Sequence, residues 1–192
     1  MAPSPLGALV AFSAVLTTYS YCSPGDACWP DEAAWAGLEA SLEGDLYAVD
    51  ASKDYDECVE CDSDAYCISA AAHGICMHAH SCAHAFCQEQ ADWDVGDHVV
   101  AVASAADVSA ALAFANAHDL AVSVKTTGHS YTGSSTAKGS LLIWTRGLPT
   151  RGAVTEGPWT GSSCGDAVDA AATLEIGGGA SWSDAYSAVG ND

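Results

Sequence analysis

The sequence predicts an α/β fold that follows a disulfide-rich segment. Short apolar runs at 99–102 and 120–124 are typical of buried strands, and a capped helical pattern separates them. Six of the nine cysteines fall between residues 58 and 87, which predicts the disulfide-rich segment. With 192 residues, the chain can hold one domain, or one small domain and part of another. We expect three regions, at 1–20, 21–92 and 93–192.

Residues 1–20 have the outline of a secretory signal peptide. An apolar run over 6–16 follows Met1, and the small residues Thr18 and Ser20 could mark a cleavage site near Tyr21. The run is too short to span a membrane, although its flank lacks the usual Lys or Arg. We therefore expect a secreted, extracellular protein.

The cysteines favour the same compartment, because such density is typical of disulfide frameworks in oxidising surroundings. Eight of the nine cysteines lie in the N-terminal part, an even number that can form pairs. Cys164 is the ninth and has no partner in that set. Histidines between residues 73 and 84 make a zinc site the alternative, but irregular spacing favours disulfides. The eight cysteines are Cys22, Cys28, Cys58, Cys61, Cys67, Cys76, Cys82 and Cys87.

The net charge of −20, with only five Lys and Arg, argues against two classes of partner. A polyanion repels the phosphates of nucleic acids and the surface of anionic membranes. We expect neither nucleic acid nor membrane as a partner, and we attribute the charge to solubility.

The region 21–92 is expected to hold one helix. Asp31 can cap it, and Trp35, Leu38 and Leu42 share one face, so we expect Trp35 to pack in the core. Gly44 is expected to end this helix. The acidic residues over 50–66 predict a loop.

The region from residue 93 begins with a β-α-β pattern. After the strand at 99–102, Ser104 and Asp107 form a capping-box variant. The helix that follows carries Val108, Leu112 and Ala115 on one side and is expected to end near His118. The strand at 120–124 then completes a parallel unit.

Further strands are expected at 141–144 and 173–176, with a long exposed excursion over 147–170 between them. The second of these strands ends in Gly177-Gly178-Gly179, and Ser181 caps a further helix. We expect Trp182 in that helix to be a packing residue. Strands without covering neighbours indicate part of a larger domain.

The stretch VKTTGHSYTGSS, at 124–135, is too rich in small hydrogen-bonding residues for a core. It follows a parallel strand, where open α/β sheets bind ligands. Gly128 and Gly133 permit unusual dihedrals, and hydroxyls surround them, which suits a pyrophosphate. The glycines at 177–179 could approach the same ligand from the opposite side. Ordinary tight turns are the alternative, because neither stretch matches an established phosphate-binding motif.

The order of these motifs resembles the start of a p-cresol methylhydroxylase-type FAD-binding domain, as in vanillyl-alcohol oxidase and berberine bridge enzyme-like oxidases. The resemblance covers residues 98–192 well and residues 25–47, with GDACWP, more loosely. It implies an FAD-linked oxidoreductase that oxidises a small organic substrate, with dioxygen as the acceptor. This chain would be the N-terminal part of such an enzyme.

The resemblance also implies roles for individual residues. The loop 126–130 would wrap the FAD pyrophosphate, His129 would bond covalently to the flavin, and residues 178–180 would pack beside the flavin. The cofactor-binding candidates are Thr126, Thr127, Gly128, His129, Ser130, Gly133, Gly178, Gly179 and Ala180. No catalytic residue is assigned.

Three positions depart from the family pattern. Thr127 replaces the first glycine of the family's Arg-x-Gly-Gly-His, and Lys125 replaces its arginine. Ala103 stands where proline is usual. Separately, Cys164 lies too early in the chain to be the family's flavin-linking cysteine. The alternative function is therefore a non-catalytic, disulfide-rich or zinc-binding secreted protein that has lost flavin binding.

Overall fold

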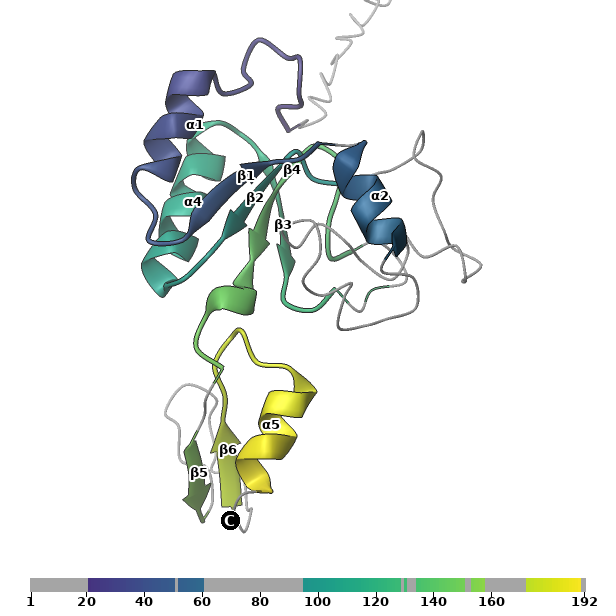
Figure 1. The fold of residues 1–192 in the computed structure, drawn as a ribbon. Helices are drawn as coiled ribbons and strands as arrows, with labels where there is room; N and C mark the ends of the chain where they lie inside the picture. The colour runs from purple at the N-terminus through teal and green to yellow at the C-terminus, as the bar shows by residue number, and fades with distance from the viewer. Residues whose placement is uncertain are drawn as a thin grey trace, which may run out of the picture.

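The computed structural model describes residues 21–50, 52–60, 95–128, 130, 134–150, 153–157 and 172–190 (Figure 1). Its helices and strands form a four-stranded sheet with flanking helices and a smaller unit joined to it. In chain order they are α1 (Glu32–Glu39), β1 (Asp45–Ala48), α2 (Lys53–Glu60), β2 (His98–Ala101), α4 (Ala105–Ala117), β3 (Ala121–Lys125), β4 (Ser140–Trp144), the 3-10 helix η4 (Thr145–Gly147), β5 (Ala153–Glu156), β6 (Ala172–Glu175) and α5 (Trp182–Val189).

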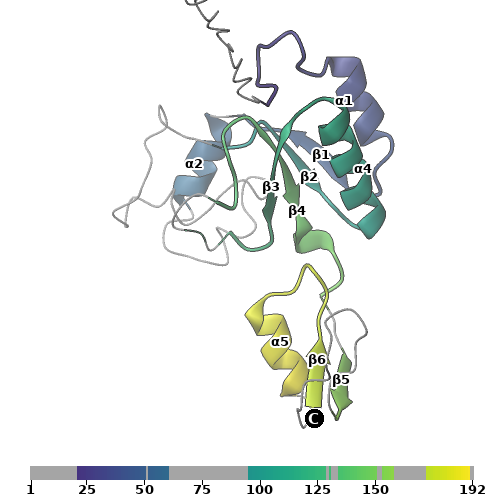
Figure 2. The ribbon, with the colours of Figure 1, turned by 180° about the vertical axis from the view of Figure 1, so that it is seen from behind.

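The larger sheet has the strand order β1-β2-β4-β3. Strands β2, β4 and β3 run parallel, whereas β1 pairs with β2 in the antiparallel direction. Helices α1 and α4 lie on one side of this sheet and α2 lies on the other, as the two opposite views agree (Figures 1 and 2). The predicted parallel β-α-β unit is confirmed, with β4 inserted between its two strands.

Helix α4 has sequence-encoded ends. The Ser104 hydroxyl accepts from the Asp107 N–H, and the Asp107 carboxylate accepts from the Ser104 N–H, which completes the predicted capping box. At the other end Asp119 has a φ of 53°, and the Leu120 N–H reaches the Ala115 carbonyl at 2.9 Å. This is a Schellman-type ending with aspartate in the position that glycine usually takes.

The Asp107 carboxylate is buried and joins three segments of the chain. It accepts backbone N–H bonds from Glu43 at 2.8 Å, Gly44 at 3.1 Å, Ala103 at 2.8 Å and Ser104 at 3.2 Å. Burial alone would raise the pKa of Asp107, but the four donors outweigh it and hold the pKa below its ordinary value. The start of β1 is thereby tied to the end of β2 and the start of α4.

The core lies between the sheet and helices α1 and α4. It contains Val100 and Ile143 from the strands, Ala111 from α4, and Trp35 and Leu38 from α1. The small side chains of α4 let the helix approach the sheet closely, whereas Leu112 is exposed. The sequence predicted separate regions at 21–92 and 93–192. In the structure, residues from both regions belong to one sheet and one core.

The ring of His98 stacks on Trp35, with centroids 3.8 Å apart and an interplanar angle of 7°. Burial lowers the pKa of His98 to about 4, so the imidazole is neutral at physiological pH. Its Nδ1 is buried and has no hydrogen-bond partner within the described part of the chain. The expected packing role of Trp35 is confirmed by its burial.

Helix α1 ends at Glu39, so the expectation that Gly44 would end it is wrong. The Ser41 hydroxyl and N–H both bond to the Leu38 carbonyl, which tightens the chain out of the helix. Gly44 instead lies against β2, where an added Cβ would collide with the Ala101 carbonyl oxygen. The glycine is needed for close backbone approach.

Two expected loops contain regular structure. Helix α2 occupies part of the acidic stretch 50–66, and Asp50 caps it by accepting from the Ser52 and Lys53 N–H groups at 3.1 Å. Carboxylates suit this first turn because they face the positive end of the helix. Strand β5 lies inside the expected excursion 147–170, where its pairing with β6 supplies the backbone partners. The predictions of loop at these positions were wrong.

The smaller unit consists of β5, β6 and α5. Strands β5 and β6 are antiparallel, and α5 begins with the predicted capping box of Ser181 and Asp184. Trp182 stacks on Tyr186 with centroids 5.9 Å apart, yet its side chain is 76% exposed. The expectation that Trp182 packs in a core is therefore wrong within the described residues. No helix in the described ranges is long and apolar enough to cross a membrane.

We predict that Asp107→Asn lowers the free energy of unfolding by about 2–4 kcal/mol, because an amide cannot accept all four N–H bonds and loses the charge. The folded pKa lies below the ordinary 3.8, so this contribution is present above that value and is lost as the pH falls through the folded pKa. Urea unfolding at neutral pH and under acid conditions measures both effects. Glu39→Gln, at an exposed position of α1, should change little.

Candidate functional site

The loop after β3 begins with Thr126, Thr127 and Gly128. Gly128 is buried and has a φ of 78°, a conformation that favours glycine, so its expected unusual dihedral is confirmed. The Ser130 N–H bonds to the Gly128 carbonyl at 2.8 Å, and the Ser130 hydroxyl bonds to that of Ser134 at 2.8 Å. The predicted site residues His129 and Gly133 lie outside the described residues.

Neighbouring strands hold this loop at both ends. The Trp144 indole N–H, at the end of β4, donates to the Thr126 carbonyl at 3.2 Å. Beyond the loop, the buried Thr136 hydroxyl accepts from the Gly96 N–H at 2.9 Å, just before β2. The loop therefore starts at the carboxyl edge of the parallel strands, as predicted, and returns to their opposite end.

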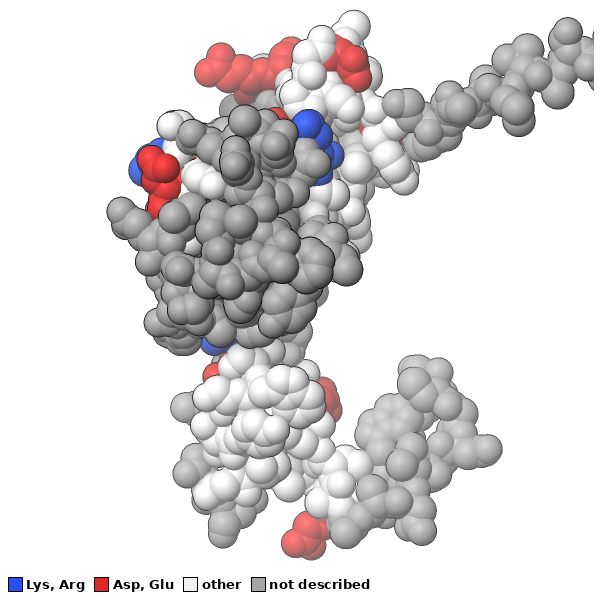
Figure 3. Space-filling model, turned by 90° about the vertical axis from the view of Figure 1, so that its right-hand side faces the viewer, with Lys and Arg blue, Asp and Glu red and all other residues white. Residues whose placement is uncertain are grey.

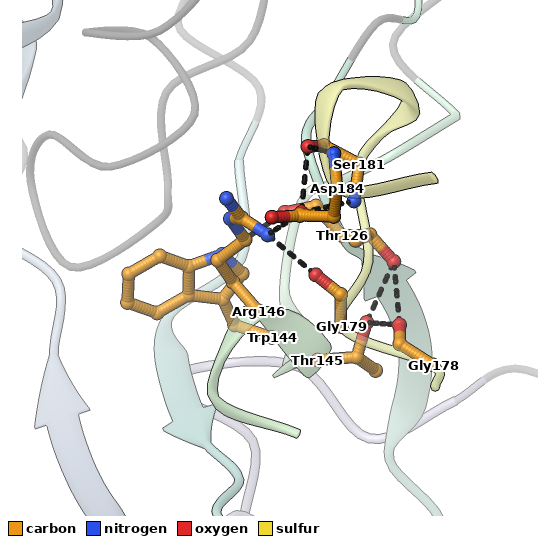
Figure 4. A network of polar contacts seen from close by, with 8 residues as sticks. All are labelled: Thr126, Trp144, Thr145, Arg146, Gly178, Gly179, Ser181 and Asp184. Atoms are coloured by element: carbon orange, nitrogen blue, oxygen red, sulfur yellow. Dashed lines mark hydrogen bonds and ion pairs between the residues drawn. The ribbon is translucent and has the colours of Figure 1, made fainter. Parts of the chain in front are cut away.

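The second glycine stretch meets the first loop directly. The hydroxyls of Thr126 and Thr145 are 2.7 Å apart, and they lie 3.3 and 3.1 Å from the Gly178 carbonyl oxygen (Figure 4). Thr145 also reaches the Lys125 carbonyl at 3.2 Å. The structure thus brings Thr126 and Gly178, which the sequence placed in one site, into contact.

Two of the three glycines are required by packing within the chain. An added Cβ on Gly177 would collide with the Pro149 carbonyl oxygen, and one on Gly179 would collide with the Leu148 carbonyl oxygen. Gly178 is exposed, and the Ala180 N–H closes a turn onto the Gly177 carbonyl at 3.1 Å. The close approach fixes this stretch against the segment that follows β4.

Two of the five basic residues lie at this junction. Lys125, the last residue of β3, is only 2% exposed, and burial lowers its pKa to about 7. Arg146 in η4 donates to the Gly179 carbonyl at 2.6 Å and to the Asp184 carboxylate at 3.1 Å. The visible surface of the smaller unit in Figure 3 carries few charged groups. The ends of β3 and β4 thus supply two basic side chains to this junction, a buried lysine and an arginine paired with Asp184.

Sequence reasoning missed Trp144, Thr145 and Arg146 as members of this junction. They follow the strand predicted at 141–144, and parallel strands present their carboxyl ends at one edge. The same rule that selected residues 126–130 could therefore have selected them.

The metal alternative is not favoured by the described cysteines. Cys22 and Cys28 form a disulfide. Cys58 is also disulfide-bonded. Asp26 lies close to the sulfurs of Cys22 and Cys28, but a disulfide offers no thiolate to a metal. The remaining cysteines, from Cys61 to Cys87 and Cys164, lie outside the described residues.

Residues 96–191, half of the chain, match the family model described as FAD binding domain. This chain belongs to the FAD-binding domain family. The predicted resemblance to the p-cresol methylhydroxylase and vanillyl-alcohol oxidase group is confirmed, because the similar proteins include VAO-type flavoproteins.

Curated relatives are similar over about two thirds of this FAD-binding chain. The VAO-type flavoprotein oxidase VAO615 of Thermothelomyces thermophilus is 35% identical over 147 residues, which are 65% of this chain and 25% of that protein. The FAD-linked oxidoreductase sor8 of Hypocrea jecorina is 30% identical over 145 residues, 67% of this chain and 25% of that protein. The chain thus spans about a quarter of the length of these relatives.

Two solved structures share the fold. The VAO-type flavoprotein MtVAO615 from Myceliophthora thermophila C1 superposes with a TM-score of 0.68 at 25% identity, over 89% of this chain and 34% of that one. MtVAO713 from the same organism gives 0.68 at 20% identity, over 89% and 33%. The predicted α/β fold class, with part of a VAO-type FAD-binding domain, is confirmed.

The residues at the junction fit an FAD diphosphate. Threonine and serine hydroxyls can donate to phosphate oxygens, and Gly128 lets the backbone turn without a side chain. Lys125 adds a cation immediately before this loop. A buried lysine with a lowered pKa is stabilised in its charged form when an anion binds nearby.

We predict that Gly177→Ala lowers the free energy of unfolding by about 2 kcal/mol or more, because the methyl group would displace the backbone at Pro149. Urea unfolding, followed by the tryptophan fluorescence of the chain, measures the loss. The control is Gly37→Ala in α1, where no atom lies near the added Cβ. That change should stabilise the protein by about 0.5–1 kcal/mol, and equal effects of the two variants would contradict the packing argument.

We also predict that Lys125 makes stability depend on pH. Its folded pKa of about 7 lies below the ordinary 10.5, so the unfolded chain binds the extra proton and stability rises with pH between these values. From pH 7 to pH 9 the gain attributable to this lysine is about 2 kcal/mol. Urea titrations should find the gain in the unmodified chain and in Lys53→Met, and should find it missing in Lys125→Met.

Proposed function

We propose that this chain is the FAD-binding portion of a secreted FAD-dependent oxidoreductase that oxidises a small organic substrate by hydride transfer to flavin. The observation that carries the proposal is the contact between the loop after β3 and the loop after β6, through Thr126 and Gly178. Both loops lie inside the family match at 96–191. Two glycine-containing loops meeting at the carboxyl edge of parallel strands provide a position for a nucleotide cofactor.

The chain's own residues would divide the work of holding FAD. Thr126, Thr127, Gly128 and Ser130 would bind the diphosphate, with Gly133 allowing the loop to turn back. Lys125 would offset the negative charge that the diphosphate brings to a chain of net charge −20. Gly178, Gly179 and Ala180 would lie beside the flavin. His129 would attach the flavin covalently.

Our proposals for the electron acceptor and for the substrate class rest on the chemistry of FAD and on the names of relatives. Bound FAD supplies hydride acceptance from the substrate, and the protein supplies orientation and electrostatics. The name flavoprotein oxidase, carried by the Thermothelomyces thermophilus relative, supports dioxygen as the acceptor. An alcohol, a carbohydrate or a secondary metabolite is the class of substrate that we propose for the whole enzyme.

Secretion is supported by the disulfide chemistry of the N-terminal part. Cys22 pairs with Cys28, and Cys58 is also oxidised, which is typical of extracellular proteins. Covalent attachment through His129 would suit that setting, because a cofactor released outside the cell cannot be recovered.

The absorption spectrum of the purified chain, before and after acid precipitation, tests the cofactor. We expect flavin bands that remain with the precipitated protein, because a covalent bond survives denaturation. His129→Ala should release the flavin to the supernatant.

His118→Ala, a histidine at the end of α4, is the matched control and should keep the flavin on the protein. A chain that stays colourless and also fails to bind added FAD would contradict the proposal that these residues hold the cofactor. Flavin that separates from the unmodified protein in acid would contradict the covalent bond alone.

A further inference from the structure

The contacts around Arg146 join elements that are far apart in the sequence. Arg146 lies in η4, directly after β4, and its Nη1 donates both to the Gly179 carbonyl oxygen at 2.6 Å and to Asp184 Oδ2 at 3.1 Å. The close view in Figure 4 shows the Arg146 side chain in contact with both Gly179 and Asp184. One side chain thus contacts both the glycine loop and the helix that follows it.

Asp184 has two roles at once. Its Oδ2 accepts from the Ser181 N–H and the Ser181 hydroxyl, both at 2.7 Å, and it also accepts from Arg146. The capping bonds of Ser181 and the charge of Arg146 lower the pKa of Asp184 to about 2, so the carboxylate stays charged at neutral pH. The cap that starts α5 is therefore also the partner that holds Arg146.

These contacts decide where the second glycine loop lies. The smaller unit is connected to the larger sheet through η4, and the loop at 177–180 reaches the first loop through the Gly178 carbonyl. The hydroxyl contacts of Thr126 and Thr145 fix one side of this loop, and Arg146 fixes the adjacent carbonyl at Gly179. Without Arg146, the loop would keep only neutral contacts on that side.

We propose that Arg146 and Asp184 are positioning residues that hold the 177–180 loop against the end of β3 and so preorganise the FAD site. This inference rests on the proposed function, and it gives Arg146 and Asp184 a part in the site beyond the capping box that the sequence predicted for Asp184. Preorganisation matters because a loop that must be ordered on binding reduces affinity.

The test compares FAD binding with global stability. The side chains of Arg146 and Asp184 are 25% and 33% exposed, and an ion pair at such a partly exposed position adds little to overall stability. In a His129→Ala background, where FAD binds without a covalent bond, we expect Arg146→Ala to weaken FAD binding by about tenfold. Titration of flavin fluorescence measures the affinity, and the urea unfolding midpoint should change little. Asp184→Asn, which keeps a capping oxygen but loses the charge, should behave in the same way with a smaller effect.

Three further measurements separate positioning from a general structural role. Arg146→Lys keeps the charge and should restore part of the affinity. The visible circular dichroism of bound flavin should change in Arg146→Ala, because the loop beside the flavin is displaced. Lys53→Ala removes one positive charge from α2 and should leave both affinity and spectrum unchanged.

Amide hydrogen exchange in the protein without added FAD tests the loop independently of the cofactor. Exchange over 177–181 should be faster in Arg146→Ala than in the unmodified chain. Unchanged exchange together with unchanged affinity would overturn the positioning role and leave the proposed function intact. If the unmodified chain fails to bind FAD, the proposed function is overturned, and the role of Arg146 in the cofactor site is overturned with it. This holds even if amide exchange over 177–181 becomes faster in Arg146→Ala.

Discussion

The fold depends on one buried carboxylate, that of Asp107. It accepts backbone N–H bonds from Ala103 and Ser104, just before its own helix, and from Gly44 and Glu43, which precede it by 63 and 64 residues. The Asp107 side chain itself is buried, so its charge would be costly without these four donors. Because this carboxylate joins the N-terminal region to α4, it fixes the antiparallel strand β1 beside the parallel strands that carry the site.

The candidate site is built mainly from backbone and hydroxyl groups. Carbonyl oxygens of Leu148 and Pro149 lie where Cβ atoms of Gly179 and Gly177 would stand, so these glycines serve contact between segments. The hydroxyls of Thr126 and Thr145 then bond across the junction to Gly178. A glycine-rich motif here has two physical causes: Gly128 adopts a positive φ, whereas Gly177 and Gly179 permit close packing.

Much of the local structure could be predicted from the sequence, because it depends on near neighbours. The capping boxes at Ser104 and Ser181 and the strands β2, β3, β4 and β6 follow from short patterns of polar and apolar residues. Helix α2 and strand β5 were missed, because an acidic stretch and a small-residue stretch both resemble loop. The helix is stabilised by a local Asp50 cap, and the strand by pairing with β6, which no local pattern reveals.

The sequence by itself determined that an α/β unit carries a glycine- and hydroxyl-rich loop at a strand end, since strand periodicity and loop composition are local properties. Only the tertiary structure decided the insertion of β4 between β2 and β3, and with it the place of Thr145 and Arg146 beside that loop. It also decided that Arg146 contacts Gly179 and Asp184, 33 and 38 residues away. Such contacts arise because strand order and backbone approach are selected by packing of the whole core, which residue spacing does not encode.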